Sequence, residues 1–251
     1  MPQIYGSRSQ YLLSQEKTNR WFSKTAFQLV FLITGIGFAA TVNFVKNDSI
    51  DPNVKIITFA IAAGIFFYAC YELLYAYSRN ELFAKYYLQG SRGEDAVFAE
   101  LVKLPNDYLV FRDIILTKGN IDFVVARSNQ IFSIEVKSHS GRISFNGEIL
   151  LKNGYPFREG DLINQTWREG KEVKEFLQHK LGHEVQVVSL LVFSEPKAYV
   201  DIDPWKPQKF GVYVLHARML NKFLQSYHSL PVALNLPAIT EFLKPHVKIV
   251  P

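Results

Sequence analysis

Residues 121–137 combine two acidic side chains and a lysine with the pattern of a β-hairpin. They read IDFVVARSNQIFSIEVK, in which two runs rich in Ile, Val and Phe flank the polar residues 127–130. Polar residues between two such runs are typical of a loop that joins antiparallel strands. Because side chains alternate faces along a strand, Ile121 and Phe123 are predicted to share one face and Asp122 to lie on the other.

The register of this hairpin would bring two carboxylates together. A four-residue loop places Ala126 across from Ile131, and the same register places Asp122 directly across from Glu135. Opposed residues on one face have Cβ atoms roughly 5 Å apart, and like charges at that spacing are destabilising. A divalent cation with oxygen ligands would compensate them, and Lys137 lies one pleat further along the face of Glu135.

The spacing of these residues resembles that of the PD-(D/E)xK nucleases. Asp122 is followed after about a dozen residues by Glu135-Val136-Lys137. The surroundings are similar to the nuclease-related domain family, NERD: Gly93-Glu94 opens a helix upstream, SHSGRI follows the core pattern, and a helix carrying Gln165 comes later. The resemblance covers about residues 91–220. Ile121 stands where the pattern has Pro, a position that is loose across the superfamily.

The resemblance implies a metal site and a set of catalytic side chains. Asp122 and Glu135 would bind Mg²⁺ (or Mn²⁺), with the Val136 carbonyl as a further oxygen ligand. Lys137 would orient or help to deprotonate the attacking water, or neutralise the phosphate. The implied catalytic set is Lys137, Glu135, Asp122, Gln165 and Glu94.

The outer members of that set have supporting roles by the same resemblance. Glu94 would hold the metal through water, although a glutamate in the first turn of a helix is also favoured by the helix dipole alone. Gln165 would steady the phosphate or the nucleophile. Asp113 is set aside as a flanking residue, because Asp122 has the better register with Glu135.

The composition suits an anionic partner. The chain has 251 residues, a formal net charge of +5 and a pI near 9.1. Such a balance suits nucleic acid or an anionic membrane surface. The single cysteine, Cys70, excludes an internal disulfide and a zinc site built from several cysteines. This length accommodates one good-sized domain and an additional segment.

Two long uncharged runs follow the polar N-terminal residues. Residues 25–45 contain no charged side chain, and residues 56–77 contain only Glu72. Each run is long enough to span a hydrocarbon core of about 30 Å. Because residues 46–55 predict a turn, we expect a transmembrane helical hairpin. The alternative is that both runs are core helices of a soluble domain.

The charges around this hairpin predict its orientation. Lys and Arg residues precede the first run and follow the second, whereas the turn is balanced in charge. The positive-inside rule predicts a multi-pass protein of the cell (inner) membrane with both termini and the nuclease-like domain in the cytoplasm. The predicted divisions are a cytoplasmic segment without an obvious fold, the hairpin, a helical linker and the nuclease-like domain, at residues 1–23, 24–77, 78–90 and 91–251.

The remaining patterns predict an α/β fold. A helix is expected from residue 93, after a break at 90–93, and Asn146-Gly147 predicts the turn of a small hairpin beside the site. The near-continuous apolar run at 184–194 is typical of a strand buried on both faces. Further strands are expected at 108–116 and 210–215, and helices at 161–181, 217–227 and 237–244. The predicted fold class is a restriction-endonuclease-like mixed sheet flanked by helices, preceded by two transmembrane α-helices.

The helix predicted at 161–181 carries cationic side chains near Gln165. They are Arg168, Lys171 and Lys174, with Trp167 beside them. They form either a solvated helix face or a surface that contacts backbone phosphates. No aromatic platform or groove-reading helix is apparent, so the patterns do not separate single-stranded from double-stranded substrates.

We expect a membrane-anchored, metal-dependent nuclease that hydrolyses phosphodiester bonds, with DNA favoured over RNA. Nucleic acid and the lipid bilayer are the expected partners, and cutting of two strands would favour a homodimer. Two other classes remain open. One is a membrane-tethered nucleic-acid-binding module without cleavage, and the other is a scaffold in which Asp122, Glu135 and Lys137 form a charge cluster without metal.

Overall fold

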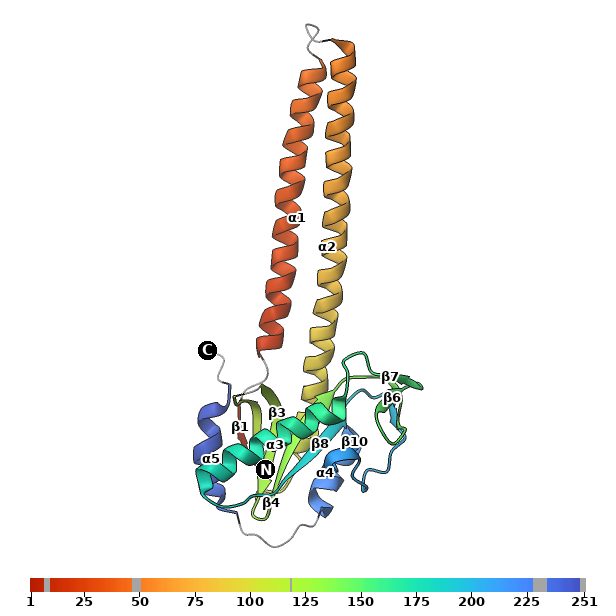
Figure 1. Cartoon of the computed structure of the whole chain (residues 1–251). Helices are drawn as coiled ribbons and strands as arrows, with labels where there is room; N and C mark the ends of the chain where they lie inside the picture. The colour runs from red at the N-terminus through yellow and green to blue at the C-terminus, as the bar shows by residue number, and fades with distance from the viewer. Residues whose placement is uncertain (7–9, 47–50, 118, 228–233, 249–251) are drawn as a thin grey trace. The chain divides into compact units, whose positions relative to one another are not determined.

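The computed structural model describes residues 1–6, 10–46, 51–117, 119–227 and 234–248 (Figure 1). The chain divides into two compact units. Tyr11–Leu88 forms one of them, and Met1–Gln10 together with Gln89–Pro251 forms the other. The second, called the globular unit below, holds every predicted site residue.

The globular unit contains two sheets and the helices that cover them. Its elements are β1 (Gln3–Tyr5), the end of α2 (Pro52–Leu101), β2 (Leu109–Ile115), β3 (Asn120–Arg127), β4 (Gln130–Lys137), β5 (Gly141–Phe145), β6 (Leu150–Lys152), β7 (Tyr155–Pro156), α3 (Leu162–Leu181), β8 (Val187–Phe193), β9 (Ala198–Val200), β10 (Tyr213–His216), α4 (Ala217–Ser226) and α5 (Leu236–Leu243), with 3-10 turns at Lys209–Gly211 and Lys244–His246. The other unit contains most of α1 (Gln10–Val45) and the first part of α2.

The larger sheet is mixed, as predicted, with the strand order β1-β2-β3-β4-β8-β10. β3 is antiparallel to both of its neighbours, whereas β8 is parallel to β4 and to β10. Leu190 of β8 packs into the core on one face of the sheet and Leu191 into the core on the other. A strand with apolar cover on both faces needs a continuous apolar sequence, and β8 has one.

Helices cover both faces of this sheet. Val97 and Leu101 of α2 and Phe223 of α4 pack with the β3 and β4 side chains of one face. Val173 of α3 and Ile239 of α5 pack with side chains of the opposite face. Figure 1 shows α3 lying across the sheet with α5 beside it. The predicted α/β class, a mixed sheet flanked by helices, is therefore confirmed for the globular unit.

The central hairpin forms in the predicted register but with a shorter loop. Ala126 pairs with Ile131, and Arg127 pairs with Gln130, so the polar loop is a two-residue turn and not four residues long. The pairing of β3 with β4 ends at Phe123 opposite Ile134, one residue before Asp122 would meet Glu135.

Regular alternation fails at Asp122. Ile121 packs in the same core cluster as Val124, whereas Phe123 packs on the opposite face. The prediction that Ile121 and Phe123 share a face is therefore wrong. The pairing of β2 with β3 skips Asp113 and Asp122, and Asp113 has a φ of 56°. A left-handed residue in one strand breaks the pleat locally and re-aims the side chains around it.

The predicted helix break at residues 90–93 is absent, because α2 continues to Leu101. A glycine inside a helix costs only about 1 kcal/mol relative to alanine. Gly93 serves close packing instead. A Cβ at this position would lie 1.8 Å from Ser138 Oγ and 2.5 Å from Ser194 Oγ, so only glycine lets the helix approach the ends of β4 and β8 this closely.

Two features of the globular unit were not predicted. β1 pairs in parallel with β2, and Tyr5 stacks on Phe111, so part of the segment at 1–23 has a defined fold. A strand of three residues with a partner more than a hundred residues away leaves no local pattern. The predicted hairpin at 142–151 is present as β5 and β6, but it belongs to a second sheet with the order β7-β6-β5-β9.

The two apolar runs differ in the structure. Among the described residues, Pro52–Arg79 of α2 is long and apolar enough to cross a membrane, with a mean hydropathy of 1.8, and none of its most apolar window is buried. The apolar part of α1 among the described residues, Gln28–Phe44, is shorter than this stretch. The predicted pair of spans is therefore not confirmed. Arg8, Lys17 and Arg20, which support the predicted orientation, lie outside the residues whose side chains are described.

Candidate active site

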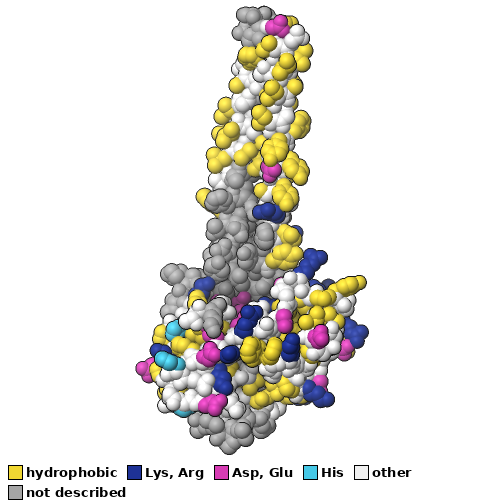
Figure 2. Space-filling model, viewed as in Figure 1, with side chains coloured by type: hydrophobic (Ala, Val, Ile, Leu, Met, Phe, Trp, Pro, Cys, Tyr) yellow, Lys and Arg dark blue, Asp and Glu magenta, His cyan; other side chains and the backbone are white. Residues whose placement is uncertain are grey.

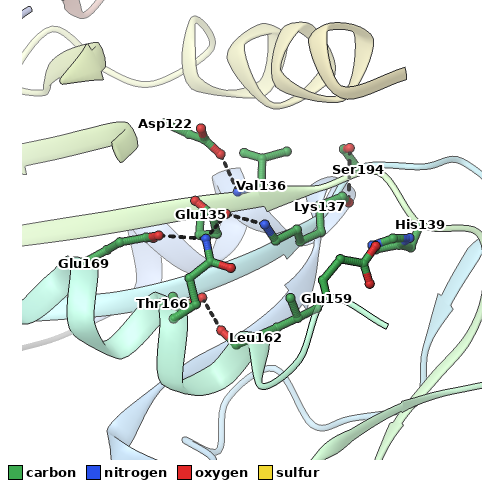
Figure 3. A network of polar contacts seen from close by, with 11 residues as sticks. Asp122, Glu135, Val136, Lys137, His139, Glu159, Leu162, Thr166, Glu169 and Ser194 are labelled. Carbon is green, nitrogen blue, oxygen red and sulfur yellow. Dashed lines mark hydrogen bonds and ion pairs between the residues drawn. The ribbon is translucent and has the colours of Figure 1, made fainter. Parts of the chain in front are cut away.

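The central contacts of the site join the end of β4 to the first turns of α3. Lys137 Nζ lies 2.6 Å from Glu135 Oε1 (Figure 3), and Gln165 Nε2 donates to the same oxygen at 3.0 Å. Burial lowers the pKa of Lys137, but the charge and hydrogen bond of Glu135 outweigh it, so the pKa lies above its ordinary value. The structure thus brings three predicted site residues into direct contact.

Asp122 lies beside this group and does not pair with Lys137. Its Oδ2 accepts a hydrogen bond of 2.8 Å from the backbone N–H of Val136, as Figure 3 shows. The N–H and C=O of one residue in a strand point to the same side, so the Val136 carbonyl also points toward β3, where Asp122 lies. Burial, followed by the charges of Glu135 and Glu94, raises the pKa of Asp122 well above its usual range.

Glu94 lies on the side of α2 that faces the sheet, and its partner is a cation that was not predicted. Arg112 Nη2 lies 3.3 Å from Glu94 Oε2 and 3.1 Å from Asp95 Oδ1. The Arg112 side chain is only 3% exposed. Burial, followed by repulsion from Asp113, raises the pKa of Glu94 to about 7. Glu94 therefore acts on Asp122 through its charge, not through a direct contact.

Glu169 is a member of the site that the sequence analysis missed. Gln165 Nε2 donates to Glu169 Oε1 at 2.9 Å, so one amide bridges Glu169 and Glu135. Burial, followed by the charge of Glu135, raises the pKa of Glu169 to about 8. The signal was available: residues four apart lie on one face of a helix, and Gln165 and Glu169 have that spacing.

Local features of α3 fix where Gln165 and Glu169 lie. Asp161 caps the helix, with its side chain accepting from the backbone N–H of Asn164 at 3.1 Å. Further along, a Cβ on Gly170 would lie 2.0 Å from Ser189 Oγ of β8. This glycine lets the backbone of α3 lie close against the sheet. The site therefore lies at the ends of two central strands, β3 and β4, beside the first turns of α3.

The donors present fit a hard divalent cation in type and charge. Asp122 and Glu135 supply carboxylate oxygens, which Mg²⁺ prefers. The acids exceed the neighbouring cations, and Glu169 Oε2 is buried without a hydrogen-bond partner. In the described parts of the chain, no three His, Cys, Asp or Glu side chains converge as a metal-binding group. The implied set of two carboxylates and the Val136 carbonyl stays a prediction.

Comparison with protein families identifies the region that carries this geometry. Residues 89–194 match the family model of the nuclease-related domain, NERD. The match starts in α2 just before Glu94 and ends directly after β8, so it contains every predicted site residue. It also contains Arg112 and Glu169, which the sequence analysis had not assigned to the site.

Similarity to individual known proteins is low. No curated protein matches the chain. Pyrococcus furiosus SfsA in complex with Ca²⁺ aligns at 17% identity over 51% of this chain with a TM-score of 0.26, and protein VC1899 from Vibrio cholerae at 10% identity over 88% with a TM-score of 0.27. The aligned regions cover 57% and 56% of those two proteins.

Proposed function

We propose that the globular unit is a metal-dependent nuclease that hydrolyses phosphodiester bonds in nucleic acid, with DNA as the expected substrate. One observation carries the proposal. Asp122 and Glu135 lie at the ends of two central strands, with Lys137 and Glu169 of α3 beside Glu135, and burial without full compensation raises the pKa of Asp122 and of Glu169. Within a nuclease-related domain, such excess negative charge is the feature that a divalent cation would neutralise.

The side chains of the site have different roles in the proposed reaction. Asp122, Glu135 and the Val136 carbonyl would hold Mg²⁺ or Mn²⁺, which when bound supplies a Lewis acid for the phosphate and an activated water. The water oxygen forms a bond to phosphorus and releases one proton to solvent, the bond to the leaving oxygen breaks, and that oxygen takes a proton from solvent.

Lys137 and Gln165 have positioning roles in this scheme. Because its pKa is raised, Lys137 stays an ammonium at neutral pH, where it donates hydrogen bonds and neutralises phosphate charge instead of accepting the proton of the water. The Gln165 amide cannot exchange protons usefully, so it orients Glu135 and Glu169.

The experiment is a thermal melt of the full chain in detergent, titrated with Mg²⁺ and with Mn²⁺, followed by cleavage assays on labelled DNA. The wild type is expected to melt at a higher temperature with metal and to cut DNA, because a ligand that binds only the folded state stabilises it. Asp122→Ala is expected to lose both effects. Asp107→Ala, at an exposed acid away from the site, is the matched control. Cleavage by Asp122→Ala at the wild-type rate would disprove the assignment.

A second candidate is a nucleic-acid-binding module that does not cleave. The 2.6 Å contact between Lys137 and Glu135 favours it, because one carboxylate is already neutralised by a protein cation. Metal-dependent affinity for DNA without product would support this candidate. Absence of both metal stabilisation and DNA binding would favour a scaffold.

We also infer that the chain is anchored in a membrane through Pro52–Arg79. At a rise of 1.5 Å per residue this stretch is longer than the roughly 30 Å of a hydrocarbon core. The finer proposal is a hairpin in which residues 25–45 also cross, with both termini in the cytoplasm. Extraction of membranes with alkaline carbonate, which removes peripheral proteins, is expected to leave the chain in the pellet. Its release would contradict the anchor.

A further inference from the structure

The flank of α3 that faces away from Gln165 carries a pair of stacked aromatic rings, of which Trp167 is partly buried and Phe210 is exposed. Trp167 of α3 and Phe210 of the turn before β10 have ring centroids 4.9 Å apart and an interplanar angle of 27°. Phe210 is 48% exposed. The two residues are far apart in sequence, so the pair exists only in the fold.

The turn that presents Phe210 has a defined backbone. Phe210 has a φ of 60° and is followed by Gly211 with a φ of 77°. The backbone N–H of Gln208 donates to Val212 O at 2.7 Å, and the N–H of Gly211 donates to Gln208 O at 3.1 Å. Left-handed backbone is strained for phenylalanine. Val212 directly after the turn is fully buried, so the chain is anchored while the ring stays at the surface.

Lysines surround the two rings. Lys171 Nζ lies 5.4 Å from the centre of the Trp167 ring, and Lys209 Nζ lies 5.2 Å from the centre of the Phe210 ring. Lys174 lines the adjoining surface pocket of about 430 Å³. Figure 2 shows Lys and Arg side chains interspersed with hydrophobic ones on the face of the globular unit that it presents.

The acidic neighbours of these lysines compete only weakly with a phosphate ligand for the ammonium groups. Lys171 lies 3.6 Å from Glu175, and Lys174 lies 3.2 Å from Glu184. All four side chains are more than a third exposed. Ion pairs at such positions contribute little, so a phosphate can replace the carboxylates.

We propose that Trp167 and Phe210, with Lys171, Lys174 and Lys209, form a platform on which an unpaired base of a single-stranded nucleic acid stacks. The proposal rests on the proposed nuclease function and specifies its substrate class. A base that stacks on Phe210 displaces the Lys209 ammonium from over that ring, and the lysines then hold the flanking phosphates. Bases inside a duplex are already stacked on their neighbours, so the platform discriminates against duplex.

Binding is measured without cleavage, on the full chain in detergent with EDTA, by the fluorescence polarisation of labelled oligo-dT. Phe210→Leu is expected to weaken binding about tenfold or more, since loss of one stacked base has an effect of that order. Phe210→Tyr is expected to restore binding because it keeps the ring. Tyr199→Leu, at an exposed aromatic on β9, is the matched control and is expected to bind like the wild type.

Unlabelled competitors test the class of ligand. Oligo-rU is expected to compete as well as oligo-dT, because stacking does not read the 2′-hydroxyl, whereas a duplex of equal length is expected to compete much less. Equal competition by the duplex, or wild-type affinity in Phe210→Leu, would overturn the platform. Failure of the nuclease function would appear separately, as binding that responds to Phe210 without any product when Mn²⁺ replaces EDTA.

Discussion

The two flanks of α3 have opposite character. On one flank, Gln165 and Glu169 bond to each other beside the end of β4, and their surroundings are buried and acidic. On the other, Trp167 is accompanied by Lys171 and Lys174, which are exposed. A buried stripe that includes Gly170 and Val173 separates them and attaches the helix to the sheet.

This difference has a consequence for a polyanionic ligand. The exposed lysines attract phosphates from solution, whereas the acids of the other flank repel them. A phosphate can approach Glu135 only when the acidic charge has been neutralised by protons or by a cation. The proposed metal would therefore be needed for substrate to reach the site as well as for the chemistry, while binding to the lysine flank would not depend on it.

The largest effect on cleavage is expected from Glu135→Gln, which changes the acidic flank and leaves the lysine flank intact. The amide keeps an oxygen that accepts from Lys137 and Gln165 but removes the negative charge, so cleavage is expected to fall by at least about a hundredfold with little change in melting. Rates are measured in single turnover with Mn²⁺. Glu148→Gln, at an exposed glutamate of the β5–β6 turn, is the control. A variant that keeps more than a tenth of the activity would remove Glu135 from the proposed ligand set.

The second largest effect is expected on stability, from a substitution in the buried stripe between the two flanks. Gly170→Ala places a Cβ 2.0 Å from Ser189 Oγ and 3.2 Å from Ser189 Cβ, so the Ser189 hydroxyl must rotate away and the two backbones must separate slightly. Denaturant unfolding is expected to show a loss of about 1–3 kcal/mol. Adding Ser189→Ala removes the nearer atom and should recover part of it. Gly90→Ala, where an added Cβ meets nothing within 4 Å, should not destabilise, and equal losses in both glycine variants would refute the packing argument.

The acidic flank also predicts how stability depends on pH without metal. Folding raises the pKa of Glu94 to about 7 and that of Glu169 to about 8. At intermediate pH the folded state therefore binds more protons than the unfolded state, so stability is greatest below the unfolded pKa near 4.5 and falls as pH rises through 7 to 8.

Melting temperatures in EDTA across this range measure the effect. Glu169→Gln is expected to flatten the curve, whereas Glu148→Gln, at an exposed glutamate of the β5–β6 turn, should leave it unchanged. Stability that rises with pH between 5 and 8 would contradict the assigned shifts. Added Mn²⁺ should stabilise more at high pH, because metal and protons compete for the same carboxylates.

Much of the site could be predicted because its chemistry lies in local sequence. Glu135 and Lys137 share a strand face, and Asp122 lies in the partner strand whose register the short turn sets. Fold class followed from the same periodicities, including the continuous apolar run of β8. These features can be predicted from the alternation of side chains along a strand and from the geometry of one hairpin.

What could not be predicted depends on contacts between distant segments. Arg112 neutralises Glu94 only because β2 lies against α2, and Phe210 meets Trp167 only through a left-handed turn. The break at Asp122 depends on the backbone of Asp113 in another strand. Gly93 was read as a helix breaker because a sequence does not show which side chain the helix must approach.

The smallest expected effect separates the lysine flank from the aromatic rings beside it. Lys174→Gln removes one cation without touching Trp167 or Phe210, so affinity for oligo-dT should fall modestly and equally for every base sequence. The slope of log affinity against log salt should decrease by about one, because each lost phosphate contact releases one fewer counterion. Lys103→Gln, at an exposed lysine elsewhere on the globular unit, should leave the slope unchanged. A slope unaltered by Lys174→Gln would assign Lys174 to its ion pair with Glu184, and phosphate binding on this flank would then rest on Lys171 and Lys209.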